Sequence, residues 1–417
     1  MLGRSTRVVP ALAATAGVAT AAAALLRPRS GVLAPVRVSA RSYYSEAELR
    51  RARAFARPQL ALFVVRSLAE AGVHAGLVRA ASAPPRARPR RRGAPAAALA
   101  GAGASVALEV ATLPITAVAR RRAMRVGLTT DPWSSWAADR AKATLLGAGI
   151  AAGGAATAVA LMRRAGDGWW LPASGVAVAA AAGSLYVGPL VIDPMFNTFT
   201  VLPAGRARSD VLDLARRADL RVGEVYTVDA SRRTTAANAY VTGVGPTKRV
   251  VLYDTLLEHF SPDETRLVIA HELAHVRHRD VLRGLAFLAA VAPVALLAVA
   301  RLAARLAPGG DAAPAGAVVP ALALAASLVA VPVGVVGRRL SRRVEARADT
   351  FALEATAAPG AWISFERRIA LRNLADPDPP AWLRALLGTH PSTVERIGIA
   401  EAYASGAITG RRPRPRP

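Results

Sequence analysis

The sequence contains no cysteine among its 417 residues. This absence excludes disulfides and thiolate metal ligands, so any zinc site must be built from histidine and carboxylate side chains. Histidine is also scarce, and the six are His74, His259, His271, His275, His278 and His390. Lysine occurs only at Lys142 and Lys248, so nearly all of the basic charge behind the formal net charge of +26 is arginine.

Most of this arginine flanks long apolar runs instead of forming one basic face interleaved with aromatic residues. Such a face would indicate nucleic-acid binding, so no nucleic-acid partner is expected. Hydrophobic residues make up 53% of the chain, with a mean hydropathy of +0.29. Soluble chains average roughly 45–50%. Because the excess lies in blocks of Ala, Val and Leu, the composition predicts a multi-pass protein with the lipid bilayer as a partner.

About seven runs are apolar enough to be predicted as membrane spans, and they cover residues 8–26, 58–78, 95–119, 144–162, 169–192, 284–300 and 315–336. The first run is interpreted as a retained span, and a cleaved signal peptide is the alternative. Glu109 lies inside the third run. An intramembrane carboxylate indicates either a functional group or a partner such as a neighbouring arginine.

Residues 193–280 have the polar content of a soluble domain. A helix is predicted over residues 209–218, with Ser209 as its N-cap. Strands are predicted over residues 223–229 and 249–253, with a further strand or sheet edge at residues 238–243.

The motif H-E-x-x-H occupies residues 271–275, within a segment that begins SPDE at Ser261. Ser261 is a typical N-cap, Pro262 suits the first helical position, and Glu264 completes a capping box. Residues four apart share one helix face, so His271 and His275 could bind one zinc ion while Glu272 faces a water molecule. The alternative is two core histidines at helical spacing.

A third ligand must come from elsewhere. Helical rise carries His278 roughly 10 Å from His271, and His259 precedes the helix. Glu345 and Asp349 are four residues apart, so one could bind zinc while the other accepts a hydrogen bond from a ligating histidine. Spacing alone supports equally an exposed helix with arginine–carboxylate pairs.

Several further blocks extend the pattern in a fixed order, and they are residues 193–199 (DPMFNTF), 228–233 (VDASRR), 238–240 (NAY), 249–257 (RVVLYDTLL), 345–349 (EARAD) and 389–391 (THP). With these blocks the chain resembles the type I CAAX prenyl endopeptidases, which are integral-membrane zinc metalloproteases. The composition favours a bacterial member. Ser392, Val241 and Thr242 depart from residues common in the family, which leaves the substrate open.

The resemblance implies one Zn²⁺ per chain with His271, His275 and Glu345 as ligands. It also implies Glu272 as the general base and Asp349 as a hydrogen-bond partner of a ligand. His390 would stabilise the oxyanion, with Arg396 behind it.

By the same resemblance, Asn238, Ala239 and Tyr240 would bind an extended peptide as an added β-strand, with Arg396 also counted among the substrate-binding residues. Peptides or membrane proteins are the expected substrates.

The predicted fold is mainly α, with about seven transmembrane helices and a split, zincin-like α+β metalloprotease domain. The predicted regions are a first helix and basic loop (1–57), four further spans (58–192), the first part of the domain (193–281), two spans (282–337), its second part (338–406) and a basic disordered tail (407–417).

The predicted function is a zinc endopeptidase for membrane-protein quality control or peptide processing. A heat-shock-type membrane metalloprotease and a catalytically silent scaffold are the alternatives. The domain is expected on the cytoplasmic side of the cell membrane, together with the basic segments 27–57 and 120–142. The loop at residues 86–92 (RARPRRR) would then lie outside, against the positive-inside rule.

Overall fold

The computed structural model describes residues 8–82, 93–220, 222–243, 248–307 and 315–406. Seven helices in this part are long and apolar enough to cross a membrane, namely α1 (Val8–Leu26), α2 (Glu46–Ser82), α3 (Ala94–Arg125), α4 (Trp133–Ala165), α5 (Trp170–Val187), α10 (Asp280–Leu306) and α11 (Ala315–Thr356). A short π-helical segment (Gly188–Ile192) continues α5 into α6 (Asp193–Phe196). The predicted fold class is confirmed. The loop at 86–92 and the tail at 407–417 lie outside the described residues.

Small residues and polar bridges join the spans. A Cβ placed on Gly101 of α3 would lie 2.4 Å from the carbonyl oxygen of Ala151 in α4, so these two helices approach closely only because glycine stands there. Between α1 and α10, Thr15 Oγ1 donates a hydrogen bond to the carbonyl of Val294 at 3.1 Å. The intramembrane carboxylate of Glu109 forms an ion pair with Arg140 of α4, which is the arginine partner considered for it.

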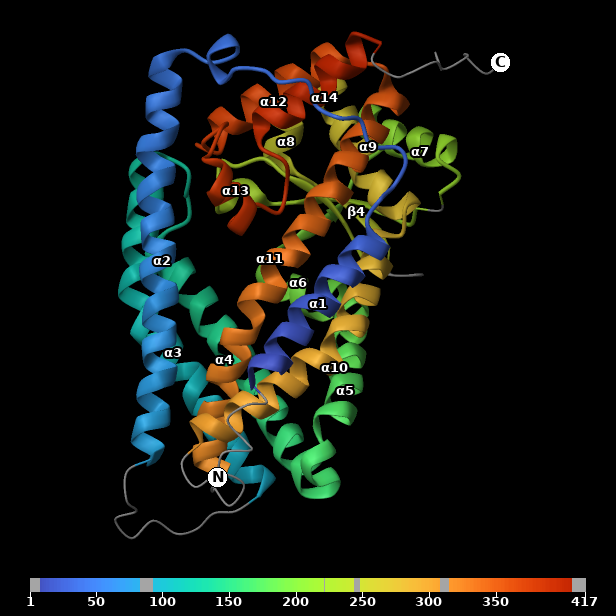
Figure 1. Ribbon diagram of the computed structural model, residues 1–417. Helices are drawn as coiled ribbons and strands as arrows, with labels where there is room; N and C mark the ends of the chain where they lie inside the picture. Colours follow the sequence, from blue (N-terminus) through green and yellow to red (C-terminus); the bar gives the residue numbers. More distant parts are fainter. Residues whose placement is uncertain (1–7, 83–92, 221, 244–247, 308–314, 407–417) are drawn as a thin grey trace.

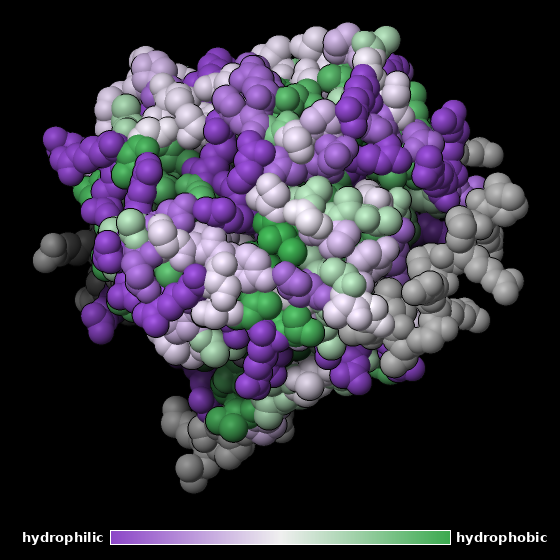
Figure 2. Space-filling model, turned by 90° about the horizontal axis from the view of Figure 1, so that it is seen from above, coloured by the Kyte–Doolittle hydropathy of each residue, from purple (hydrophilic) through white to green (hydrophobic). Residues whose placement is uncertain are grey.

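The remaining elements gather at one end of the helix bundle (Figure 1). Hydrophilic side chains predominate on this end, with smaller apolar areas between them (Figure 2). Both non-helical connectors reach it, since Val36 N donates to Gly398 O at 3.1 Å and Thr130 N donates to Arg233 O at 3.0 Å. The two basic segments therefore lie on the side of the domain, as predicted.

The domain contains a four-stranded sheet in the order β1-β2-β4-β3, formed by β1 (Phe199–Val201), β2 (Val225–Val228), β3 (Ala239–Thr242) and β4 (Arg249–Tyr253). β2 and β4 are parallel and the other two pairs are antiparallel. The domain helices are α7 (Arg206–Arg217), α8 (Asp254–His259), α9 (Pro262–Arg277), α12 (Pro359–Arg372), α13 (Ala381–Leu387) and α14 (Thr393–Ala404). β3 lies at the sheet edge, as predicted.

The core of the domain forms where α9 packs between the sheet and α12. Leu267, Ile269 and Leu273 of α9 are fully buried there with Trp362 of α12. Since α12 follows the seventh span and α9 precedes the sixth, the two halves of the domain share one core. Burial of large apolar side chains, worth about 1.5–3 kcal/mol each, therefore fixes α9 in place.

Two helix predictions were wrong in extent. The helix predicted from Ser209 begins at Arg206 with Gly205 as its N-cap, so Ser209 lies inside its first turn. The run predicted as a span over residues 315–336 is only the first part of α11, which continues through Gly337 to Thr356. Gly337 is tolerated in a helix, so nothing interrupts the hydrogen bonding. As a result, one continuous helix joins the bundle to the site described below.

Candidate metal centre

Local sequence sets the start of α9. Ser261 Oγ accepts a hydrogen bond from Glu264 N at 3.2 Å, and Glu264 Oε2 accepts one from Ser261 N at 2.8 Å. Pro262 occupies the first turn, so the predicted capping box is present. Glu264 also contacts α12, where Arg368 Nη1 lies 2.6 Å from Oε2 and Ser364 Oγ lies 2.8 Å from Oε1. The cap therefore orients α9 against the second half of the domain.

His271, His275 and Glu345 converge from α9 and α11. Their candidate ligand atoms all lie within 4.8 Å of one another. The two histidine Nε2 atoms are 3.3 Å apart. Glu345 places Oε2 at 3.2 Å from His271 Nε2 and Oε1 at 3.7 Å from His275 Nε2. Two imidazole nitrogens and a carboxylate at this separation could hold a tetrahedral divalent cation and leave one position free.

The surroundings of Glu345 fit a cation. Among the described residues, its buried Oε2 atom has no hydrogen-bond partner. The atom nevertheless lies 3.2 Å from His271 Nε2 and 3.3 Å from His390 Nε2. A buried carboxylate oxygen without a hydrogen bond is costly, and a metal ion between these atoms would satisfy it. The donor set therefore suits zinc.

The same pocket stabilises positive charge. Burial lowers the pKa of His271, but the Asp349 carboxylate beside Nδ1 and the negative charge of Glu345 outweigh it and raise the pKa to about 10. A field that favours a charged imidazole also favours a bound cation.

Asp349 lies behind His271. Its Oδ1 atom is 2.9 Å from His271 Nδ1, and its side chain is fully buried. Arg396 donates to both carboxylate oxygens, from Nη2 at 2.7 Å to Oδ1 and from Nε at 3.0 Å to Oδ2. A carboxylate in this position sets the orientation of the imidazole ring and leaves Nε2 free for a metal.

Arg396 was predicted behind His390, among the substrate-binding residues, and that role stays a prediction. Its guanidinium lies between the buried carboxylates of Asp349 and Glu366, with Nη1 2.6 Å from Glu366 Oε1. Burial lowers the pKa of Arg396, but these two carboxylates raise it above its ordinary value. Arg396 therefore holds the carboxylate behind His271.

His275 has a corresponding partner that the sequence analysis missed. Its Nδ1 atom lies 3.1 Å from Oδ2 of Asp280. Arg347 and Arg283 both contact the other carboxylate oxygen. Helical periodicity could not have found Asp280, because α9 has ended there and Arg279 adopts a left-handed conformation with φ 54°. That turn starts α10 with Asp280 facing back toward His275.

Glu272 lies between the two histidines, next to strand β3. The backbone N–H of Val241 donates a hydrogen bond to its carboxylate, while burial raises its pKa. A glutamate with a raised pKa accepts protons more readily near neutral pH, as a general base must.

His390 also reaches the site. Its Nε2 atom lies 3.3 Å from Glu345 Oε2, and its Nδ1 atom hydrogen-bonds to Thr389 Oγ1 at 2.9 Å. Arg342 fixes the preceding loop, since its Nη1 atom donates to Arg384 O at 3.0 Å and to Gly388 O at 2.5 Å. The side chain is 57% exposed, so it can meet a bound molecule.

The edge strand β3 presents backbone groups beside this site. Tyr253 N donates to Asn238 O, so residues 238, 240 and 242 form the hydrogen-bonded pairs with β4. In an antiparallel pair the intervening residues, Ala239 and Val241, direct their N–H and C=O groups to the outer edge. No strand pairs with that edge in the described part of the chain. Of the three residues predicted to bind substrate, Ala239 directs its backbone to this edge, and Val241, which was not among them, does so too.

The other two residues of that prediction have different positions. Asn238 is exposed, and its Oδ1 atom accepts a hydrogen bond from Ala239 N at 3.0 Å. The backbone of Tyr240 faces β4, and its ring packs edge-on against Tyr253 at 6.4 Å. Among the remaining histidines, His278 ends α9 and packs on Phe351 at 5.9 Å, away from the site as expected.

Two known protein families match parts of this chain. The family "Peptidase family M48" matches residues 202–404, and the family "CAAX prenyl protease N-terminal, five membrane helices" matches residues 123–198. Together the two matches cover well over half of the chain.

Two curated relatives illustrate the similarity. The chain is 29% identical over 307 residues to "Uncharacterized metalloprotease YhfN" of Bacillus subtilis, covering 71% of each chain. It is 38% identical over 100 residues to "CAAX prenyl protease 1" of Saccharomyces cerevisiae, covering 24% of this chain and 22% of the relative. The chain thus spans most of the first relative but only about a fifth of the second.

A solved structure has the same fold. The crystal structure of S. mikatae Ste24p superposes with a TM-score of 0.73 and 16% identity, covering 96% of this chain and 100% of that chain. This similarity extends to the seven spans and to the domain together.

Proposed function

Because the chain belongs to peptidase family M48, we propose that its metal centre is a zinc site with His271, His275 and Glu345 as the three protein ligands. The chain is an integral-membrane metalloendopeptidase. The convergence of these three side chains within 4.8 Å carries the assignment. One Zn²⁺ per chain follows, because three ligands and one open position are the usual set for catalytic zinc.

Zinc at this site would supply a Lewis acid for the scissile carbonyl and for a water molecule. The residues around it would do the rest. Glu272 would take a proton from the water and later deliver it to the leaving amine. His390, exposed at the rim, would donate a hydrogen bond to the developing oxyanion. Asp349 and Asp280 would hold His271 and His275 in the orientation that directs their Nε2 atoms to the metal.

An extended peptide is the proposed substrate. It would add to the outer edge of β3 through the backbone of Ala239 and Val241, whose N–H groups now donate to Asn238 Oδ1 and to the Glu272 carboxylate. Val241 N–H already contacts Glu272, so a paired peptide would lie directly beside the base. Backbone pairing of this kind is tolerant of side chains, which suits processing of varied peptides or membrane-protein segments. The relatives named as CAAX prenyl proteases add prenylated substrates as a further class to test.

The domain is proposed to face the cytoplasm. Both basic connectors contact it, and short arginine-rich loops remain on the cytoplasmic side of a cell membrane. Labelling of single cysteines introduced at exposed positions would check this orientation, because the natural chain has none. A cysteine placed at Arg232 should react with an impermeant reagent only after the cells are opened.

The variant Glu272→Gln tests the mechanism. We expect it to retain one zinc per chain by mass spectrometry of the metal while its cleavage of an unstructured peptide falls about 10²–10⁴-fold. Glu258→Gln, at an exposed position on α8, is the matched control and should cleave normally. Full activity in Glu272→Gln would contradict the assignment. An inactive wild-type enzyme with bound zinc would favour the silent scaffold.

A further inference from the structure

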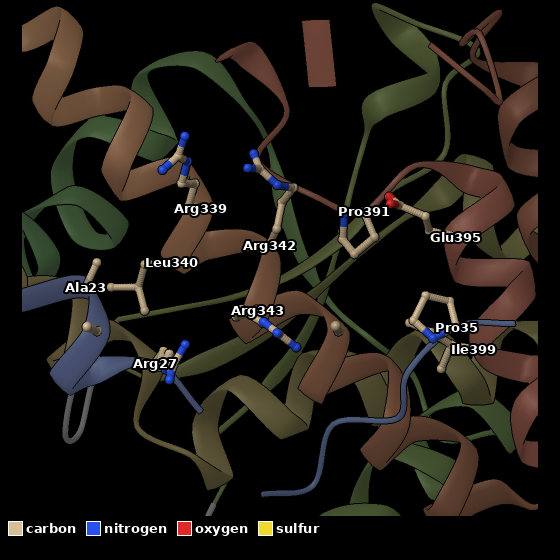
Figure 3. A pocket seen from close by; sticks show the side chains of 12 residues that line it. Ala23, Arg27, Pro35, Arg339, Leu340, Arg342, Arg343, Pro391, Glu395 and Ile399 are labelled. Atoms are coloured by element: carbon tan, nitrogen blue, oxygen red, sulfur yellow. The ribbon is translucent and has the colours of Figure 1, made fainter. Parts of the chain in front are cut away.

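A cavity of ≈ 430 Å³ lies between the end of α1 and α11, where part of α14 also lines it (Figure 3). Four arginines line the cavity, and they are Arg27, Arg339, Arg342 and Arg343. Among the described residues that line it, Glu395 is the only acidic one. Arg342 also holds the loop that precedes His390, whereas the other three arginines take no part in the metal centre.

Most of this charge is uncompensated. The side chains of Arg27, Arg339 and Arg343 form no ion pair or hydrogen bond with any described residue. Glu395 does not neutralise them, because its carboxylate accepts from Ser392 N at 2.7 Å and lies 3.5 Å from Arg384 Nε. Guanidinium groups gathered around one cavity repel one another, and a bound anion would relieve that repulsion.

The position of the cavity at the end of two membrane spans favours a phospholipid headgroup over a small inorganic anion. α1 ends at Leu26, and the apolar stretch of α11 gives way to arginine after Gly337. The cavity thus lies where two spans leave the apolar layer. Ala23, Ala24 and Leu340 form an apolar wall beside the arginines. A small inorganic anion would make no contact with that apolar wall. A phospholipid, in contrast, places its phosphate at the membrane surface, level with the arginines, and its acyl chain along the apolar wall.

Arg343 does not point toward the metal ligands. Arg343 and Glu345 are two residues apart on α11, so their side chains leave the helix roughly 160° apart. The charge of Arg343 is therefore directed away from Glu345, while Pro391 of the lining directly follows His390 in the sequence. The direction of Arg343 argues against the carboxylate of a peptide substrate as the anion.

We propose that this cavity binds the headgroup phosphate of an anionic phospholipid, with Arg27, Arg339 and Arg343 as its charged contacts. A guanidinium can donate two parallel hydrogen bonds to phosphate oxygens, and basic pockets between transmembrane helices recognise lipid headgroups in this way. The lipid would bridge α1 and α11.

Native mass spectrometry of the full-length zinc-loaded protein in detergent tests the proposal. The probes are phosphatidylglycerol, phosphatidylcholine and, as a separate arm, inorganic phosphate. We expect tighter retention of phosphatidylglycerol than of phosphatidylcholine. In Arg27→Gln/Arg343→Gln its affinity should fall about thirtyfold, from two lost charges at the membrane surface.

Matched variants separate this effect from misfolding. Arg29→Gln/Arg50→Gln removes the same charge from exposed positions outside the cavity and should bind phosphatidylglycerol like the wild type. Arg27→Lys/Arg343→Lys keeps the charge and should retain most of the binding. Thermal unfolding monitors the fold of each variant.

Three results would overturn the proposal. They are equal retention of the two lipids, unchanged binding in the Gln double variant, and displacement of phosphatidylglycerol by millimolar inorganic phosphate. None of these measurements uses peptide cleavage, so the outcome is independent of the proposed catalytic mechanism.

Discussion

Asp280 Oδ2 lies 3.1 Å from His275 Nδ1, across the turn that ends α9. This contact matches the one between Asp349 and His271, where the distance is 2.9 Å. An arginine holds each carboxylate in turn, namely Arg347 for Asp280 and Arg396 for Asp349. Each proposed histidine ligand is therefore held by its own carboxylate–arginine pair, and the two pairs come from different parts of the sequence.

Asp280→Asn should weaken metal binding. The amide cannot orient His275 as a charged carboxylate does, so zinc affinity is expected to fall about 10–100-fold. Competition with a chromogenic chelator measures this affinity. Asp263→Asn, at a mostly exposed position in the first turn of α9, is the control and should bind zinc like the wild type. Unchanged affinity in Asp280→Asn would show that the contact does not support the metal.

Glu345→Gln should remove the metal from the purified protein. Loss of the only carboxylate ligand leaves two imidazoles, which are too few for a stable zinc site. Elemental analysis after dialysis is expected to give much less than one zinc per chain. Glu354→Gln changes an exposed residue further along the same helix and should keep its zinc. If both variants retained zinc, Glu345 would not be a ligand.

Val241→Pro tests the edge of β3 as the peptide-binding strand. Proline removes an N–H that faces the outer edge, and proline is tolerated at such positions. The same N–H donates to Glu272, so the loss of about 1–1.5 kcal/mol per hydrogen bond should lower kcat/KM at least tenfold. A higher KM with an unchanged pH profile of kcat would assign the loss to peptide pairing and not to the base. Val241→Ala keeps the N–H and should stay within a few-fold of wild type. An equal loss in both variants would point to the side chain instead of the backbone.

Glu366 should make the stability of the domain depend on pH. Burial raises its pKa to about 7, because Arg396 is shared with Asp349 and cannot fully compensate. The unfolded chain ionises this group near its ordinary value of about 4.3. Between about pH 4.3 and 7 the folded state therefore binds more protons than the unfolded state. The free energy of unfolding falls as pH rises from about 4.3 through 7. Melting temperatures at pH 5 and pH 8 should differ more for wild type than for Glu366→Gln. Equal differences would refute the assignment.

Local features were predictable because they depend on neighbouring residues. The cap at Ser261 and the pairing of His271 with His275 follow from helical geometry over a few positions. The spans follow from composition over lengths that match a bilayer. Strand β4 was predicted with its bounds, since residues 249–253 combine β-branched residues with a neighbouring turn signal.

Helix ends were less predictable. Gly205 instead of Ser209 caps α7, and α11 runs through Gly337 without a break. Both cases depend on which of several permissible residues the surrounding structure uses. A serine near a helix start can be the N-cap or lie within the first turn, and a glycine in a long apolar run can end a helix or lie inside it.

The sequence by itself determined that this protein spans the membrane and carries a paired-histidine metal motif. Tertiary structure decided which carboxylates complete the site. Spacing left a ligand-bearing helix and an exposed helix with arginine–carboxylate pairs equally possible for Glu345 and Asp349. The packing of α11 on α9 brings Glu345 to both Nε2 atoms and Asp349 to Nδ1 of His271. The contacts of Asp280 and Arg396 were likewise decided by tertiary structure. They cross a turn or join distant segments, and helical or strand periodicity does not predict such contacts.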